Sequence, residues 1–186
     1  CIRKPPSGRS RDRRLNEEEY SRLYAAVAKC RNPLIGMIIK FAISTGMRRS
    51  EILALEWRNI DFNKRLAKIE RSKNGQSRTI PLSSSAVNVI QSLINTKSMA
   101  AETPYHTCCR LFPVSANALR LAWGRICKRS YIDDFNFHDL RHEAISRFFE
   151  LGLSIAEVSL ISGHKDIRML LRYTHLKANE LVDKLN

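Results

Sequence analysis

The sequence predicts a mainly α-helical domain with one small antiparallel β-sheet, an α+β fold class. Apolar residues recur at helical spacing through most of the chain. Between residues 66 and 82 the pattern alternates instead, around an Asn74-Gly75 pair that is typical of a hairpin turn. The hydrophobic content of 44% over 186 residues is enough for one packed core.

The first half of the chain contains three predicted helices. One begins at Asn16, a good N-cap before three acidic residues, and runs to about Cys30. A second begins at Pro33, because proline suits the first helical position, and it ends at Gly46 after a stretch that is apolar on most faces. A short third helix begins at Ser50.

The predicted hairpin is followed by further helices. Strands over 66–71 and 77–82 place Lys73 at the tip or shoulder of the hairpin. Ser154 begins a capping box, and Gly163 ends the helix that the box starts. The helices expected after Ser84 lie near residues 85–96, 115–129, 138–151, 154–162, 166–173 and 177–185.

The charge of the chain predicts a polyanionic partner. Thirty-two Lys and Arg against 18 Asp and Glu give a net charge of +14. Nucleic acid is the first candidate and an anionic membrane surface the second, while a basic surface without a ligand is the alternative. No apolar run is long enough to predict a membrane span. Five cysteines without a Cys-x-x-Cys pair suggest neither a disulfide framework nor a zinc ribbon, and they fit reduced thiols in a cytoplasmic protein.

Residues 1–14 read as a basic arm or linker. They carry six positive charges, two prolines and a glycine. The first domain boundary is therefore expected near Leu15, with one domain over 15–186 and a further domain on the N-terminal side of the arm.

The segment from His138 to His142, His-Asp-Leu-Arg-His, is the sharpest local motif. On a helix, His138, Arg141 and His142 share one face. The segment falls in the first turn, where free N–H groups suit a phosphate, and an arginine there can bind two phosphate oxygens. A basic helix face with one buried histidine is the alternative.

Three other motifs are weak when each is taken alone. Arg48 follows a glycine turn, and Glu51 is close enough along a helix to orient its guanidinium. Lys73 is either a mobile general acid or part of a soluble turn. Tyr173 follows His164 by nine positions, and its hydroxyl, with a free pKa of about 10, needs cationic neighbours and a base before it can attack phosphorus.

Taken in order, these segments resemble the tyrosine recombinase, or phage integrase, family. TGMRRSEILALEW (45–57) resembles its first arginine box and SKNGQSRTIPL (72–82) its lysine hairpin. HDLRH (138–142) and SGHKDIRMLLRYTH (162–175) resemble its remaining boxes, and the resemblance covers 15–186. One departure is Ser162, where leucine is common, and we expect it to leave the chemistry undisturbed. The resemblance implies the tyrosine recombinase catalytic-domain fold, with residues 1–14 as the arm from an N-terminal core-binding domain.

The resemblance also implies a set of catalytic roles. Tyr173 would attack the scissile phosphate and form a 3′-phosphotyrosine, with a 5′-hydroxyl as leaving group. The non-bridging oxygens would be held by three side chains, Arg48, Arg141 and His164. Lys73 would protonate the leaving oxygen.

Supporting roles follow from the same resemblance. His138 would take the proton of the tyrosine or position its hydroxyl. Glu51 would support the arginines and His142 the start of its helix. No cofactor or metal is implied, since the cations can supply the charge stabilisation that Mg²⁺ gives other phosphoryl-transfer enzymes.

The implied function is that of a site-specific DNA recombinase that integrates or excises a mobile element, such as a phage. Its partners would be double-stranded DNA with specific recombination sites, three further copies of the chain in a tetramer, and accessory DNA-bending or directionality proteins, in the cytoplasm of a bacterial or phage-infected cell. A type IB topoisomerase and a non-catalytic DNA-binding module are the alternatives. Two questions stay open: whether residues 177–186 dock on a neighbour or fold back, and whether Tyr173 acts in its own subunit.

Overall fold

The computed structural model describes residues 13–70, 77–98 and 109–174. The helices in these ranges are α1 (Glu17–Ala28), α2 (Pro33–Thr45), α3 (Arg49–Ala54), α4 (Ser84–Ser98), α5 (Ala116–Ser130), α6 (Asp139–Glu150), α7 (Ile155–Ser162) and α8 (Arg168–Leu171). A 3₁₀ turn, η1 (Trp57–Asn59), precedes the strands β1 (Ile60–Asp61), β2 (Leu66–Ile69) and β3 (Arg78–Pro81). The mainly α fold with a small antiparallel sheet is confirmed.

Helix ends lie close to where their capping residues predict them. The side chain of Asn16 accepts a hydrogen bond from the backbone N–H of Glu19 at 2.8 Å, and the Glu19 carboxylate accepts one from the backbone N–H of Asn16 at 3.1 Å. Pro33 opens α2, and Gly46 ends it in the left-handed region with φ of 62°. These local signals fix the entry into α1 and both ends of α2.

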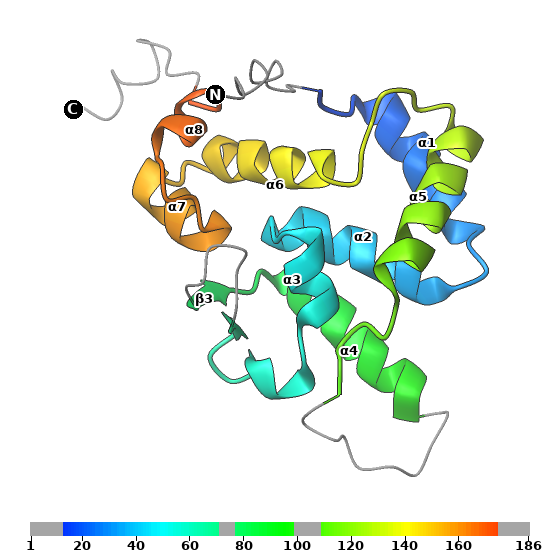
Figure 1. The fold of residues 1–186 in the computed structure, drawn as a ribbon, viewed down its shortest axis with the longest axis horizontal. Coiled ribbons are helices and arrows are strands. Elements are labelled where there is room, and N and C mark those ends of the chain that lie inside the picture. The colour runs from blue at the N-terminus through cyan, green and yellow to red at the C-terminus, as the bar shows by residue number, and fades with distance from the viewer. Residues whose placement is uncertain (1–12, 71–76, 99–108, 175–186) are drawn as a thin grey trace, which may run out of the picture.

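Helix α2 is the centre of the domain (Figure 1). It packs against α4 and α6, while α1 lies against α5. Apolar residues on most faces of α2 are buried, and the ring centroids of Phe41 and Phe112 are 5.4 Å apart. Neither α2 nor any other helix in the described ranges is long and apolar enough to cross a membrane.

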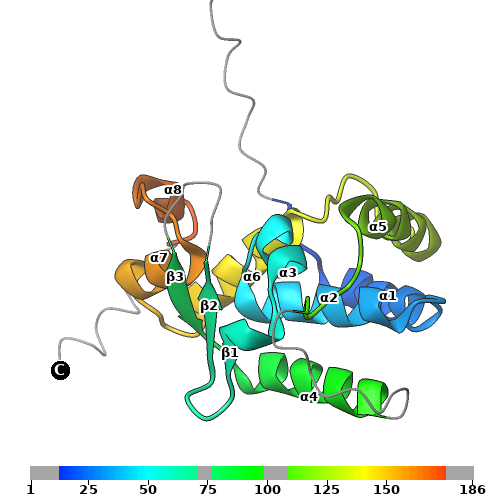
Figure 2. The ribbon, with the colours of Figure 1, turned by 60° about the horizontal axis from the view of Figure 1, so that its bottom comes forward.

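The three-stranded sheet has the order β1-β2-β3 and is antiparallel throughout, with Ala67 opposite Ile80. Both of these side chains are fully buried, so this face of the hairpin belongs to the core. Strand β3 contacts α7, and the two lie side by side in Figure 2. The segment that joins β2 to β3, which contains Lys73, lies outside the described residues.

A second, smaller cluster joins α6, α7 and α8. Its buried members are Ile145, Val158 and Leu170, one from each helix. Helix α8 is shorter than the predicted 166–173, because Arg172 and Tyr173 follow it in a turn. The cluster therefore fixes the segment that carries Tyr173 against α6. The predicted helix over 177–185 lies outside the described residues.

Candidate active site

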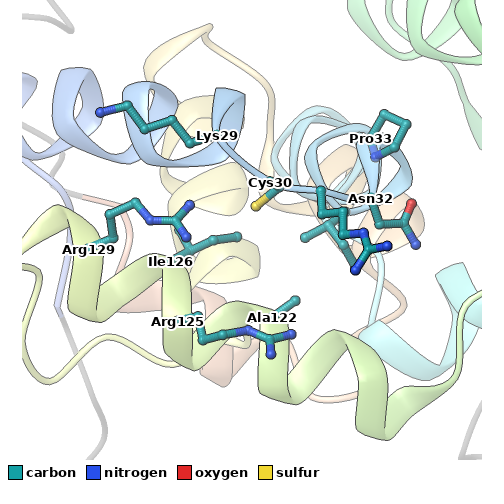
Figure 3. A pocket seen from close by; sticks show the side chains of 10 residues that line it. Lys29, Cys30, Asn32, Pro33, Ala122, Arg125, Ile126 and Arg129 are labelled. Atoms are coloured by element: carbon teal, nitrogen blue, oxygen red, sulfur yellow. The ribbon is translucent and has the colours of Figure 1, made fainter.

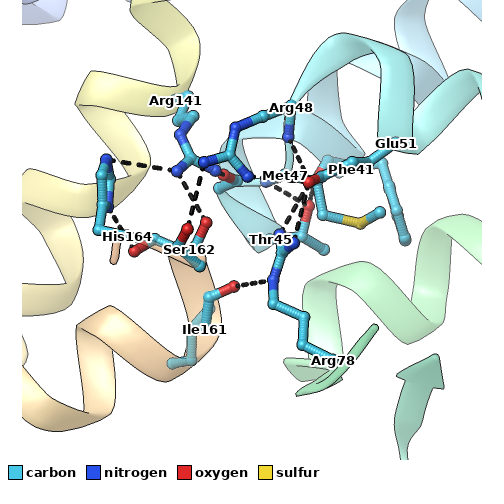
Figure 4. Close-up of polar contacts among 12 residues, drawn as sticks. Phe41, Thr45, Met47, Arg48, Glu51, Arg78, Arg141, Ile161, Ser162 and His164 are labelled. Carbon is cyan, nitrogen blue, oxygen red and sulfur yellow. Dashed lines mark hydrogen bonds and ion pairs between the residues drawn. The ribbon is translucent and has the colours of Figure 1, made fainter. Parts of the chain in front are cut away.

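The C-terminal end of α7 holds three arginines that come from distant parts of the chain. The carbonyls of residues 161, 162 and 163 accept hydrogen bonds from Arg78, Arg141 and Arg48, at 3.2, 2.7 and 3.2 Å respectively (Figure 4). Carbonyls at this end of a helix lack partners within the helix and carry partial negative charge, so they suit cations. We call Arg48, Arg78 and Arg141 the arginine cluster.

Glu51 joins two members of the cluster. Its buried carboxylate accepts hydrogen bonds from Arg78 at 2.8 and 2.9 Å and from the Arg48 side chain at 2.9 Å. A further bond comes from the backbone N–H of Arg48 at 2.9 Å. Burial would raise the pKa of Glu51, but the hydrogen bonds and charges of the two arginines outweigh it and lower the pKa to about 2. Glu51 therefore stays ionised, as its predicted supporting role requires.

Arg141 is the most deeply buried member of the arginine cluster. Its Nη1 donates to the carbonyl of Gly46 at 2.7 Å. Burial and the nearby charge of Arg48 lower the pKa of Arg141 to about 9, so the side chain remains charged at neutral pH. One carboxylate thus faces three guanidinium groups, and the excess positive charge suits an anion.

His164 lies at the edge of the cluster, directly after the left-handed turn at Gly163. Its Nε2 is 3.4 Å from Nη2 of Arg141, and its Nδ1 is 2.7 Å from Oγ of Ser162. Burial, Arg141 and Arg48 lower the pKa of His164 to about 4. The ring is therefore neutral at pH 7.

Tyr173 lies between aromatic and cationic side chains. Its hydroxyl contacts Nδ1 of His142 and accepts a hydrogen bond from Nη2 of Arg172 at 2.5 Å. Its ring stacks on Phe149, with the ring centroids 6.3 Å apart. Tyr173 is also close enough to Arg141 to influence the pKa of that guanidinium. The phenol thus has cationic neighbours and a nitrogen that can accept its proton.

The structure gives His142 a more direct position than the sequence suggested. His142, which the sequence analysis expected to support the start of its helix, contacts the tyrosine hydroxyl. His138 is the residue before α6, and its ring meets that of His142 edge-on at 5.2 Å. Burial lowers the pKa of both histidines, to about 4 for His142. Both are neutral at pH 7 and able to accept a proton.

Three residues of the site were missed or discounted in the sequence analysis: Arg78, Arg172 and Ser162. A signal for Arg78 was present, since alternation along the predicted strand places it on the same face as the buried Ile80. No comparable signal marked Arg172, because its contact depends on how α8 docks. Lys73 lies outside the described residues, so the structure says nothing of its position.

A separate basic depression lies between the α1–α2 connection and α5 (Figure 3). It has a volume of about 710 Å³, and Lys29, Arg31, Arg125 and Arg129 are among its lining residues. None of its lining residues belongs to the arginine cluster. In the part of the chain that the structure describes, no three His, Cys, Asp or Glu residues are grouped as metal ligands.

Comparisons with known proteins identify the family of this chain. The Phage integrase family matches residues 13–180. A shufflon-specific DNA recombinase from Escherichia coli is 42% identical over 186 residues, which are 100% of this chain and 46% of that protein. The integrase of Salmonella phage P22 is 33% identical over 197 aligned positions, which cover 98% of this chain and 48% of that integrase. The chain thus spans about half the length of these curated relatives.

Solved structures show the same fold. The catalytic domain of bacteriophage HP1 integrase matches with a TM-score of 0.67 and 26% identity, covering 92% of this chain and 94% of that one. The Tn1549 transposon integrase in complex with circular intermediate DNA matches with a TM-score of 0.73 and 19% identity, covering 98% and 67%. A family match over most of the chain, two curated relatives above 30% identity and a shared fold all agree: this chain belongs to the phage integrase family of tyrosine recombinases.

Proposed function

We propose that this chain is the catalytic domain of a site-specific DNA recombinase and that Tyr173 is its nucleophile. The observation that carries the proposal is the arginine cluster, in which three guanidinium groups lie close together beside the tyrosine and one carboxylate, Glu51, bonds to two of them. Such an excess of fixed positive charge stabilises the phosphorane-like transition state more than the DNA ground state. In the proposal, residues 15–186 form this domain and 1–14 the arm from an N-terminal core-binding domain.

Arg48, Arg141 and His164 hold the non-bridging oxygens of the scissile phosphate. Hydrogen bonds to Gly46 and to the carbonyl at position 162 orient the Arg141 side chain and leave further N–H groups for the phosphate. The Arg48 side chain is 21% exposed, so its guanidinium is open to an incoming ligand. Loss of one such donor costs about 3–4 kcal/mol in comparable sites.

In this proposal, His138 and His142 accept the proton that the Tyr173 hydroxyl loses when it attacks. In the absence of DNA, the tyrosine hydroxyl contacts neutral His142 and accepts a hydrogen bond from Arg172. His142 contacts this hydroxyl and His138 contacts the ring of His142, and in the proposal the pair takes up the proton as the bond between the Tyr173 oxygen and phosphorus forms. The bond from phosphorus to the 5′ oxygen breaks in the same step, and Lys73 gives that oxygen its proton. The phosphodiester is conserved as a 3′-phosphotyrosine, which a second 5′-hydroxyl can attack.

The partner proposed from this chemistry is double-stranded DNA with specific recombination sites. The net charge of +14 supports it, and a related transposon integrase is in complex with DNA. A tetramer on DNA, accessory DNA-bending or directionality proteins and a cytoplasmic site of action complete the proposal. The reaction integrates or excises a mobile element; the 42% identity to a shufflon-specific recombinase favours DNA rearrangement as a second candidate.

A suicide DNA substrate tests the proposal. It is a nicked duplex that carries a candidate recombination site, so that the 5′-hydroxyl fragment diffuses away after cleavage. We expect an SDS-resistant protein–DNA adduct with the parent and none with Tyr173→Phe, while both bind the duplex equally. Binding without any adduct would instead identify a non-catalytic DNA-binding module. Relaxation of supercoils without strand exchange would identify a type IB topoisomerase.

A further inference from the structure

Ser162 contacts two proposed phosphate-binding side chains at once. It is the last residue of α7 and is fully buried. Its carbonyl accepts a hydrogen bond from Nη2 of Arg141 at 2.7 Å, and its Oγ lies 2.7 Å from Nδ1 of His164. The Ser162 hydroxyl is therefore a buried polar group that lies within hydrogen-bond distance of the His164 ring (Figure 4).

The two nitrogens of His164 constrain where the proton of the ring can be. A neutral imidazole has one donor and one acceptor nitrogen, whereas a guanidinium can only donate. Because Nη2 of Arg141 is the group that faces Nε2, at 3.4 Å, Nε2 is the acceptor when no anion is bound. Nδ1 then carries the proton and donates a hydrogen bond to the Ser162 hydroxyl oxygen.

A bound phosphate reverses this requirement. A phosphate oxygen accepts hydrogen bonds, so Nε2 of His164 must donate, and a neutral ring then carries its proton on Nε2 and needs a donor at Nδ1. A serine hydroxyl can fill both roles, since it is a donor and an acceptor. An apolar side chain at this position could fill neither.

We propose that Ser162 is a positioning residue that holds Nδ1 of His164 in both tautomers and so lets Nε2 change from acceptor to donor when a DNA phosphate arrives. This inference rests on the proposed function. It also revises the expectation that Ser162 leaves the chemistry undisturbed, because the hydroxyl sets the hydrogen-bonding state of a phosphate-binding ring.

The first test reads the tautomer of His164 directly. The chain is labelled with ¹⁵N-histidine, the signals of His164 are assigned by comparison with His164→Gln, and inorganic phosphate is titrated in at pH 7.5. In the parent, we expect the proton on Nδ1 without phosphate and on Nε2 at saturation. In Ser162→Ala, we expect Nδ1 to show no hydrogen-bonded signal and the ring to be a mixture of tautomers. A parent ring that keeps one tautomer throughout would overturn the proposal.

The second test measures single-turnover formation of the adduct on the suicide duplex. We expect Ser162→Ala to slow it about ten-fold, as loss of a partner that orients a functional histidine does elsewhere. Ser162→Thr, which restores a hydroxyl, should return the rate to within about two-fold of the parent. Ser130→Ala is the control, because Ser130 is a buried serine at the end of α5 whose Oγ donates to carbonyls of its own helix and, among the described residues, contacts none of the proposed catalytic side chains.

The outcomes separate this inference from the proposed function. Equal adduct rates for the parent and Ser162→Ala would overturn the role of Ser162 while leaving Tyr173 as nucleophile. A parent without any adduct would remove the proposed function, and the tautomer measurement would still decide whether Ser162 controls the ring. If Ser162→Ala fails to fold, Ser162→Cys takes its place, since a thiol is a weak donor and acceptor and predicts an intermediate rate.

Discussion

Replacement of Glu51 by glutamine should lower the free energy of unfolding of the domain. The loss should be smaller when an anion is bound to the arginine cluster. The substitution keeps the shape of the side chain but removes the one charge that Arg48 and Arg78 share. Removal of one partner from a buried ion pair costs about 3–5 kcal/mol. Because the Arg48 side chain is 21% exposed, water can solvate part of its freed charge. We therefore expect the lower end, about 3 kcal/mol.

Thermal unfolding followed by circular dichroism measures this effect. In a chain of this size, 3 kcal/mol corresponds to a fall in Tm of about 9 °C. Glu150→Gln is the matched control, since Glu150 pairs with Arg14 at 2.5 Å on the surface, where the carboxylate is 55% exposed. An exposed pair contributes about 0–1 kcal/mol, so the control should lose less than about 3 °C.

Sulfate distinguishes an anion site from a purely structural ion pair. In Glu51→Gln the arginine cluster has a larger excess of positive charge, so sulfate at constant ionic strength should recover part of the lost Tm. General effects of sulfate on stability appear equally in Glu150→Gln and are subtracted. A decrease in Tm of less than 3 °C for Glu51→Gln would refute the reasoning. An equal rise in Tm of both variants with sulfate would refute it as well.

Three further predictions concern histidines, the nucleophile and a glycine. The pKa values of His142 and His164 are lowered to about 4, so between pH 6.5 and 4 the unfolded chain binds protons that the folded chain does not. The free energy of unfolding should therefore fall as pH falls through this range. Urea denaturation at pH 7 and 4.5 measures the free energy of unfolding, and equal values at the two pH values would contradict the prediction. Arg172→Ala removes a donor from the nucleophile's hydroxyl, so the rate of adduct formation should fall about ten-fold with DNA affinity changed far less, and an unchanged rate would count against this contact. Gly163→Ala should cost more than about 1 kcal/mol in urea denaturation, because φ is +69° and the new Cβ would lie 2.9 Å from a guanidinium of the cluster. Gly124→Ala, inside α5 with open space around it, should stabilise by about 0.5–1 kcal/mol, and similar effects of the two substitutions would contradict the steric argument.

The parts of the fold that the sequence predicted are those with local signals. Capping residues such as Asn16 and the glycine at position 46 act on their own helix ends, so helix bounds follow from the sequence to within a few residues. Strand β1 was not predicted, because two residues show no periodicity and the strand forms only by pairing with β2. Helix α8 is shorter than expected for a similar reason, since its end depends on packing in the second cluster.

The same distinction applies to the site. The contact between Arg48 and Glu51 lies within one helical turn, so spacing alone predicted it. The bonds of Glu51 to Arg78 depend on how the sheet docks against α3 and α7, which no local pattern encodes. Spacing placed His138 and His142 on one face of α6, but only the docking of α8 determines that His142 meets the tyrosine hydroxyl.

Mass spectrometry of the trapped adduct tests the central claim most directly. After reaction with the suicide duplex, the chain is digested with protease and nuclease, and the peptide that retains a nucleotide is sequenced. We predict a single modified peptide with the nucleotide joined through a 3′-phosphate to Tyr173, and no such peptide from Tyr173→Phe. A nucleotide on another side chain, or an equal yield of adduct from the phenylalanine variant, would contradict the account.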